Sequence, residues 1–155
     1  MNALLHFSED PSIELFVPRV SSLDAEPVVW AIDEKHAPSY WFPRDCPRAC
    51  CWTETSRMHA MESCWLDRFR ACNLFAYAFD PSGFELKLGE AGYWVARREV
   101  RPISVMPLGD LMQRHIEAQI DLRIVENLWP VIDSIVDSGM EFSIIRKANA
   151  QPRSC

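Results

Sequence analysis

The sequence contains little glycine, which excludes the phosphate-binding loops that depend on it. Its 155 residues include 5 glycines, and these lie apart from one another. A dinucleotide fingerprint or a Walker loop needs several glycines within a few residues, because the backbone must approach the phosphates closely. Neither motif is present.

Positive charge is also scarce relative to negative charge. The chain has 16 lysines and arginines against 22 aspartates and glutamates, which gives a formal net charge of −6. Binding along a nucleic-acid backbone depends on Lys and Arg displacing counterions, so no extended nucleic-acid surface is expected. Two clusters of basic residues still leave a small anionic ligand possible. They are Arg44 with Arg48, and Arg97 and Arg98 with Arg101.

Long apolar runs are absent. No run approaches the roughly 20 residues of a transmembrane helix, and the first residues lack the regions of a secretory signal. We therefore expect a cytoplasmic protein with no membrane partner. The cysteines are then expected to be reduced thiols, and no metal is expected because their spacing does not match a zinc knuckle. They are Cys46, Cys50, Cys51, Cys64, Cys72 and Cys155.

Apolar periodicity predicts a mixture of strands and helices. Strands are predicted at residues 4–7, 28–32, 49–52, 74–79, 93–96, 100–106, 122–125 and 142–145. The clearest predicted helix covers residues 55–72, where apolar side chains recur at three- and four-residue spacing. Two further helices are predicted, one starting near Asp110 at a capping box and one from Pro130 to Gly139.

This order of elements lacks a strict strand–helix alternation, which favours an α+β fold. The length of the chain suits one domain. We predict a single α+β domain over residues 1–149, with a split mixed or antiparallel sheet and about three helices, followed by a flexible tail over residues 150–155. The sequence does not predict an oligomeric state.

Two pairs of polar residues are candidates for chemistry. His6 and Ser8 lie two apart on the first predicted strand, so both side chains point to one face and could orient a ligand. His59 and Glu62 lie three apart on the predicted helix and share a face, as in a proton-transfer pair. Each pair also has a structural interpretation, as a buried imidazole paired with backbone groups and as a packing contact.

Three segments resemble a family of uncharacterised, mostly bacterial proteins. They are the opening His6-Phe7-Ser8-Glu9-Asp10-Pro11, the central Pro43-Arg44-Asp45-Cys46-Pro47-Arg48, and Leu128-Trp129-Pro130. The likeness covers nearly the whole chain. It implies no activity.

The chain also resembles, more distantly, the ADP-ribosyltransferase superfamily, including its rifampicin-modifying and RNA 2′-phosphotransferase branches. The stretch His6-Phe7-Ser8 is similar to a first strand in which a histidine is followed at plus two by Thr or Ser. Tyr40 follows the predicted strand 28–32 and matches the residue that stacks on nicotinamide. The stretch Glu99-Val100-Arg101-Pro102 is similar to a strand with a catalytic glutamate.

This resemblance implies an ADP-ribosyltransferase-like fold with NAD as substrate and a small molecule or nucleic-acid end as acceptor. His6, Glu99 and Tyr40 would be catalytic, with Glu99 stabilising the oxocarbenium charge that builds on the ribose. The ligand-binding candidates are Ser8, Arg44, Arg48, His59 and Glu62, of which the arginines suit a pyrophosphate. No Glu-x-Glu pair or Ser-Thr-Ser strand is present, so modification of protein arginine is not implied.

Two alternatives remain open from the residues. An NAD-independent lyase, cyclase or hydrolase would use His6, His59 and Glu62 as acid and base. A non-catalytic binding module would use exposed aromatic side chains as its contact surface. These are Tyr40, Trp41 and Trp52.

Overall fold

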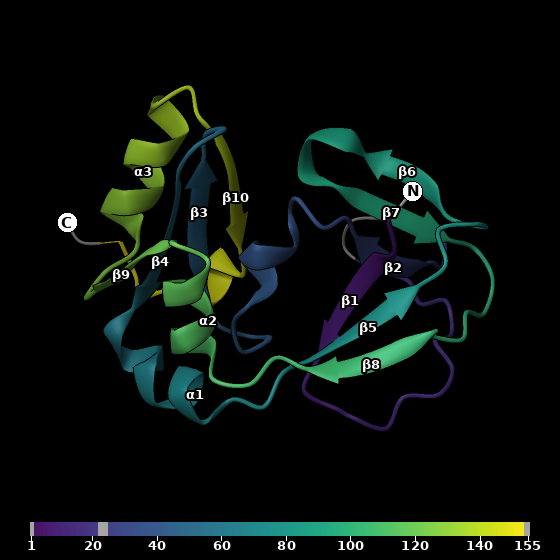
Figure 1. Cartoon of the computed structure of the whole chain (residues 1–155). Coiled ribbons are helices and arrows are strands. Elements are labelled where there is room, and N and C mark those ends of the chain that lie inside the picture. Colours follow the sequence, from purple (N-terminus) through teal and green to yellow (C-terminus); the bar gives the residue numbers. More distant parts are fainter. Residues whose placement is uncertain (1, 22–24, 154–155) are drawn as a thin grey trace. The chain divides into compact units, whose positions relative to one another are not determined.

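The computed structural model describes residues 2–21 and 25–153, which fold as an α+β protein (Figure 1). It has one antiparallel sheet, one mixed sheet and three α-helices in the described residues, so the predicted fold class is confirmed. The chain divides into two compact units, each with its own sheet. The first unit is Met1–Trp41 with Leu74–Leu108, and the second is Phe42–Asn73 with Gly109–Cys155. The predicted single domain over residues 1–149 stays a prediction.

The first unit is built on a six-stranded antiparallel sheet in the order β6-β7-β2-β1-β5-β8. Its strands are β1 (Leu4–Ser8), β2 (Val29–Ile32), β5 (Phe75–Phe79), β6 (Glu85–Leu88), β7 (Tyr93–Ala96) and β8 (Ser104–Pro107). The short 3₁₀ helix η1 (Ala37–Tyr40) follows β2, and η3 (Gly89–Ala91) joins β6 to β7. The sequence missed β6, whose four residues are all exposed, because an edge strand of this kind has no buried face.

The core of the first unit lies on one face of this sheet. Side chains alternate between the two faces of a strand, so Leu4 and His6 of β1 point to one face and Leu5 and Phe7 to the other. The segment between β1 and β2 covers the first face through Phe16, which is bridged to Val100 by backbone hydrogen bonds of 2.8 and 2.9 Å. The buried core residues are Leu4, Phe16, Val29, Ala31, Tyr77, Phe79, Ala96 and Val100.

The second unit is built on a four-stranded sheet in the order β10-β3-β4-β9. Its strands are β3 (Arg48–Trp52), β4 (Arg57–Glu62), β9 (Asp121–Val125) and β10 (Glu141–Ile145); β4 and β9 are parallel, and the other pairs are antiparallel. The helices are α1 (Leu66–Ala71), α2 (Leu111–Glu117) and α3 (Trp129–Asp137), with 3₁₀ turns η2 (Ser63–Trp65) and η4 (Lys147–Asn149). A core cluster joins α3 to the sheet and comprises Ala49, Cys51, Ala60, Leu128, Ile132 and Ile135.

The predicted helix over residues 55–72 is wrong. Residues 57–62 form β4, which pairs with β3 on one side and β9 on the other, and only Leu66–Ala71 is α-helical. Because β4 is buried on both faces, its apolar residues do not alternate with polar ones, and their spacing imitates that of a helix. One consequence is that His59 and Glu62, three apart on a strand, point to opposite faces of the sheet.

The other two predicted helices are confirmed, and their ends follow from the residues there. The side chain of Asp110 accepts a hydrogen bond of 3.1 Å from the backbone N–H of Gln113, so it caps α2 as expected. Pro130 lies in the first turn of α3, where its missing N–H is not needed, and Gly139 follows the helix with a φ of 76°.

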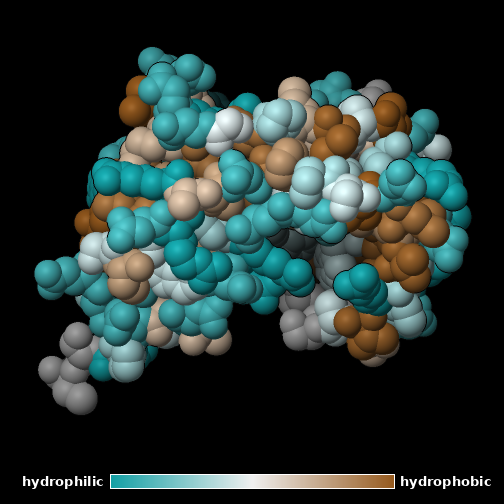
Figure 2. Space-filling model, turned by 90° about the horizontal axis from the view of Figure 1, so that it is seen from below, coloured by the Kyte–Doolittle hydropathy of each residue, from teal (hydrophilic) through white to brown (hydrophobic). Residues whose placement is uncertain are grey.

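Exposed large apolar side chains are spread over several elements. Figure 2 shows, on one face of the molecule, brown apolar patches lying among teal polar residues. Three of these side chains, Ile103, Val105 and Met106, belong to or adjoin the edge strand β8. In the described part of the chain, no helix has both the length and the apolar character needed to cross a membrane.

Candidate functional site

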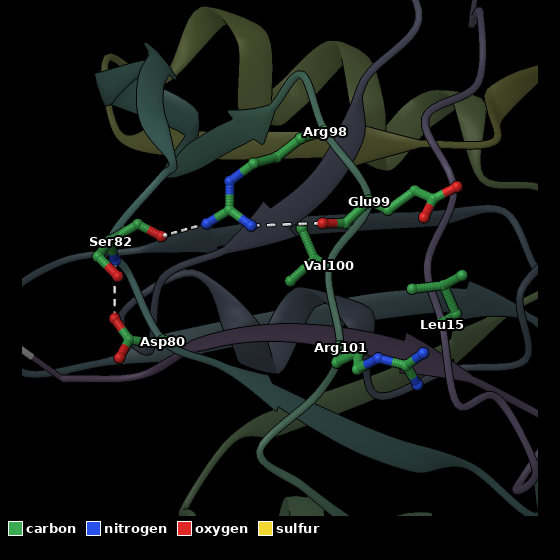
Figure 3. A pocket seen from close by; sticks show the side chains of 7 residues that line it. All are labelled: Leu15, Asp80, Ser82, Arg98, Glu99, Val100 and Arg101. Carbon is green, nitrogen blue, oxygen red and sulfur yellow. Dashed lines mark hydrogen bonds between the residues drawn. The ribbon is translucent and has the colours of Figure 1, made fainter.

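A hollow of about 450 Å³ opens on the first unit beside the segment that follows β7 (Figure 3). It is large enough for a small ligand, since such sites usually measure roughly 300–1,000 Å³. It is lined by Leu15, Asp80, Ser82, Arg98, Glu99, Val100 and Arg101. Glu99 is therefore in the lining, as is part of the basic cluster noted in the sequence.

The backbone places Glu99 and Arg101 at this surface. Val100 is buried, with 7% of its surface exposed, and its backbone pairs with that of Phe16. Because neighbouring residues of an extended segment point to opposite sides, the anchoring of Val100 turns Glu99 and Arg101 outward. Figure 3 shows both side chains on the side of Leu15, whereas Arg98 extends toward Ser82.

The charged groups of the hollow differ in how they are held. Arg98 makes long contacts of 3.4 Å with the carbonyl oxygens of Ser82 and Glu99, and the carboxylate of Asp80 accepts the backbone N–H of Ser82 at 2.8 Å. That hydrogen bond lowers the pKa of Asp80. The Glu99 carboxylate and the Arg101 guanidinium have no hydrogen-bond or ion-pair partner among the described residues. They are available to a ligand.

His6 is held within the first unit rather than in the lining of the hollow. Its Nδ1 lies 3.0 Å from the backbone oxygen of Trp30, to which it donates, and its ring packs edge-on against Phe16 at 4.8 Å between centroids. Ser8 accepts a hydrogen bond of 3.1 Å from the backbone N–H of Asp10, which closes the turn after β1. These contacts suit structural roles.

Tyr40 lies on the opposite face of the sheet from His6. Its ring stacks on Phe7 with a 7° angle between planes, and its hydroxyl donates to the hydroxyl of Tyr93 at 2.5 Å. Since Phe7 and His6 are neighbours on β1, their side chains point to opposite faces. The structure thus brings neither His6 nor Tyr40 into the hollow of Glu99.

The two arginine candidates of the second unit are placed differently from each other. Arg48 has 2% of its surface exposed. Its guanidinium donates to the backbone oxygens of Cys46, Arg44 and Pro43 at 2.9, 3.3 and 3.4 Å, and it lies over the ring of Phe42. Arg48 therefore organises the loop before β3, whereas the side chain of Arg44 is exposed.

Glu62 is fully buried and holds the start of α3. Its carboxylate accepts the backbone N–H of Leu128 at 2.9 Å and that of Gln151 at 3.0 and 3.1 Å. The described end of the chain is bound to the same region, where Arg153 forms a two-pronged ion pair with Asp133. Residues 154–155 of the predicted tail lie outside the described residues. Glu62 thus serves the packing of the second unit.

His59 is also fully buried, on the face of β4 opposite to Glu62. Its Nδ1 lies 2.8 Å from Nε2 of His115, a residue of α2. The predicted pairing of His59 with Glu62 on one helix face is therefore wrong, because a strand replaces the helix. Of the aromatic residues expected on the surface, Trp52 is buried with 4% of its surface exposed, and Tyr40 and Trp41 are half-buried.

No disulfide bond joins the cysteines of the described residues, which are Cys46, Cys50, Cys51, Cys64 and Cys72. Burial raises the pKa of Cys46 to about 12, so it is a poor nucleophile at neutral pH. Within residues 2–21 and 25–153, no group of three or more His, Cys, Asp or Glu side chains is placed to hold a metal ion.

The sequence did not predict the hydrogen-bonded carboxylate–imidazole pair formed by Asp33 and His36. Oδ1 of Asp33 accepts both the backbone N–H of His36 at 3.0 Å and its Nδ1–H at 2.6 Å. Gly92, with a φ of 69°, passes so close that a Cβ there would overlap the His36 ring and lie 2.7 Å from Oδ2 of Asp33. The one sequence signal was the spacing Asp-x-x-His directly after a strand.

The fold and the site define a small α+β protein with an open hollow, of small-molecule size, that carries both signs of charge. The chain belongs to the family described as "Family of unknown function (DUF6886)", whose model matches residues 5–57 and 52–150. Comparison with curated proteins found no significant match, and comparison with solved structures found none.

Proposed function

We propose that the hollow around Glu99 binds a phosphorylated ribosyl compound such as NAD or ADP-ribose, and that the protein is an ADP-ribosyltransferase-like enzyme. The observation that carries the proposal is the exposed, partner-free carboxylate of Glu99 in a hollow that two arginines also line. Arginine binds phosphate oxygens through forked, charge-assisted hydrogen bonds. Arg98 and Arg101 are therefore the phosphate-binding candidates, in place of Arg44 and Arg48.

The mixture of charges favours a ligand with two unlike ends. Two arginines and two acidic residues, Asp80 and Glu99, line the hollow, so it does not select for anions alone. NAD has a negatively charged pyrophosphate and a positively charged nicotinamide ribosyl group. The first complements the arginines and the second complements Glu99.

The chemistry follows from the same carboxylate. When the bond between the ribose C1′ and the nicotinamide nitrogen breaks, its electron pair leaves with nicotinamide and positive charge develops on the ribose. An anionic Glu99 stabilises this charge, and the hydroxyl of water or another acceptor then attacks C1′ and loses its proton to solvent. The step balances without any further reactant.

The ligand interactions that the resemblance assigns to His6 and Tyr40 do not enter this proposal. His6 donates to Trp30 and packs on Phe16, and Tyr40 packs on Phe7. The site proposed here consists of Glu99 with Arg98 and Arg101. An acid–base enzyme that relies on His59 and Glu62 is disfavoured, because both are fully buried and hydrogen-bonded.

Calorimetric titration with ADP-ribose and with NAD at low salt tests the binding. Arg101→Gln should weaken the affinity about tenfold or more, the usual effect of losing a charged hydrogen bond. The matched control is Arg44→Gln, because Arg44 is an exposed arginine outside the lining. Absence of binding by the wild-type protein, or equal losses in the two variants, contradicts the proposed site.

Release of nicotinamide from NAD tests the reaction. Glu99→Gln keeps the size of the side chain but removes its charge, so it should bind ADP-ribose like the wild type and release nicotinamide at least about 100-fold more slowly. If the wild-type protein binds NAD but releases no nicotinamide, the proposed enzymatic activity is refuted and only the binding function remains.

A further inference from the structure

The second unit contains two fully buried histidines that the proposed function does not use. His59 lies on β4 and His115 on α2, and neither exposes any measurable surface. Their rings meet edge to face with centroids 4.9 Å apart. Nδ1 of His59 lies 2.8 Å from Nε2 of His115, so a polar contact joins the helix to the sheet.

The hydrogen bonds around these rings determine which nitrogen of each ring carries the proton. Nε of Arg57, which can only donate, lies 2.8 Å from Nε2 of His59, so this nitrogen must accept. A neutral His59 therefore carries its proton on Nδ1 and donates to Nε2 of His115. His115 in turn donates from Nδ1 to the backbone oxygen of Leu111 at 2.8 Å. We call Arg57, His59, His115 and the Leu111 carbonyl the relay.

Neither ring can take a proton without losing a hydrogen bond of the relay. An imidazolium donates from both nitrogens. A proton on Nε2 of His59 would face the N–H of Arg57, and a proton on Nε2 of His115 would face the N–H of His59. Each protonation replaces a donor–acceptor contact at 2.8 Å by two donors pointing at each other.

The surroundings also oppose positive charge. Burial lowers the pKa of His59 well below its usual value, and the partner ring and two cations, Arg57 and Arg48, lower it further. Burial and Arg57 lower the pKa of His115, against the opposing effect of its bond to Leu111.

The other groups that face the rings come from each neighbouring element. Cys50 of β3 and Leu122 of β9 pair with His59 across the sheet, and Phe69 of α1 and Phe42 contact the rings. The thiol and the hydrocarbon groups among them add no negative charge that would stabilise an imidazolium.

We propose that the relay is an acid-released latch, which holds α2 against the sheet of the second unit near neutral pH and frees the helix when a histidine is protonated. The folded state excludes protons that the unfolded histidines bind below about pH 6.5. The stabilisation is therefore complete above that pH and is lost as the pH falls below it. Because the lost hydrogen bonds tie α2 to β4, α2 is the element expected to open.

Imidazole ¹⁵N NMR of the wild-type protein tests the relay directly, since the chain has 4 histidines to assign. At about pH 7.5, His59 and His115 should both carry the proton on Nδ1 alone. Hydrogen exchange then follows the latch on lowering the pH to about 5. Amide exchange measures the equilibrium constant for opening of α2. For each proton that opening takes up, this constant should rise up to about tenfold per pH unit as the pH falls. Amides of β1 and β5 in the first unit should show no matching increase.

A pair of variants separates the latch from general acid sensitivity. His115→Gln keeps a donor and an acceptor but does not titrate, so the exchange of α2 should depend less steeply on pH than in the wild type. The control is His6→Gln, which removes a histidine of the first unit and should leave α2 exchange unchanged. The proposal is overturned if both rings are protonated near pH 6.5 while the α2 amides stay protected from exchange. It is also overturned if either histidine carries its proton on Nε2 at about pH 7.5. The wild-type measurements decide it even if His115→Gln fails to fold.

Discussion

The charged groups of the proposed site in the first unit and those in the core of the second unit are placed in opposite ways. In the first unit, Glu99 and Arg101 stand at the surface, and neither has a partner among the described residues. In the second unit, Arg48, His59 and Glu62 are buried, and each is hydrogen-bonded. Unsatisfied charge at a surface can bind a ligand, whereas satisfied charge in a core supports the fold. The same residue types therefore indicate a site in one unit and an internal framework in the other.

The two glutamates sharpen this comparison most. Glu62→Ala leaves the buried backbone N–H of Leu128 and the backbone N–H of Gln151 without their acceptor and should lower the free energy of unfolding by about 3 kcal/mol. Glu99→Ala should change it by less than about 0.5 kcal/mol, because that side chain is exposed. Urea denaturation of both variants measures the difference. Equal effects would break the distinction between the units.

Two glycines extend the comparison to the backbone. Gly92 and Gly109 both have a positive φ, of 69° and 74°, but a Cβ would overlap the His36 ring at Gly92 and meets nothing within 4 Å at Gly109. We expect Gly92→Ala to cost about 3 kcal/mol and Gly109→Ala about 1 kcal/mol, the second reflecting backbone strain alone. Thermal unfolding of the two variants gives the values. A Gly92→Ala protein as stable as Gly109→Ala would mean that the Asp33–His36 pair is not rigid.

The cap of α2 gives the next smaller effect. Asp110→Ala removes the acceptor for the N–H of Gln113 and should lower the stability by about 1 kcal/mol. Asp110→Asn, which retains an acceptor oxygen, should recover most of the loss. Urea denaturation compares them, and an Asn variant no better than Ala would assign the effect to charge rather than to capping.

The smallest effect is expected at the surface of the second unit. Arg153→Gln breaks the two-pronged ion pair with Asp133, whose pKa is lowered chiefly by the hydrogen bond from Arg153. Exposed ion pairs contribute little, so the change in the free energy of unfolding should be the smallest of this series and should shrink further at high salt. A loss as large as that of Glu62→Ala would show that the end of the chain supports the unit through Arg153.

The sequence predicted elements best where a polar residue or turn marks an end of the element. Asp110 marked the start of α2, and the apolar residues of segment 4–7, followed by a polar turn, indicated β1. It failed at β4, where the partly buried Met58 and the buried Met61 point to opposite faces and their three-residue spacing resembled a helix. Periodicity reports one buried face and carries no information where two faces are buried.

The candidate site was predictable only in part. Glu99 and the basic cluster were identified, but Asp80, Ser82 and Leu15 join them through pairing of distant segments that no local pattern encodes. The relay was missed for the same reason, since His59 and His115 stand 56 residues apart. Polar residues in a core are meaningful only together with their partners, and those partners come from the tertiary fold.

The amide of Gln151 has a consequence for biosynthesis. Glu62 is translated long before Gln151, yet its buried carboxylate gains its second backbone donor from that late residue. Until Gln151 has been added to the growing chain, the Glu62 carboxylate at the start of α3 therefore lacks its second backbone donor. The second unit should reach its final stability only after Gln151 has left the ribosome, and proteases should remove a chain that is truncated near residue 150.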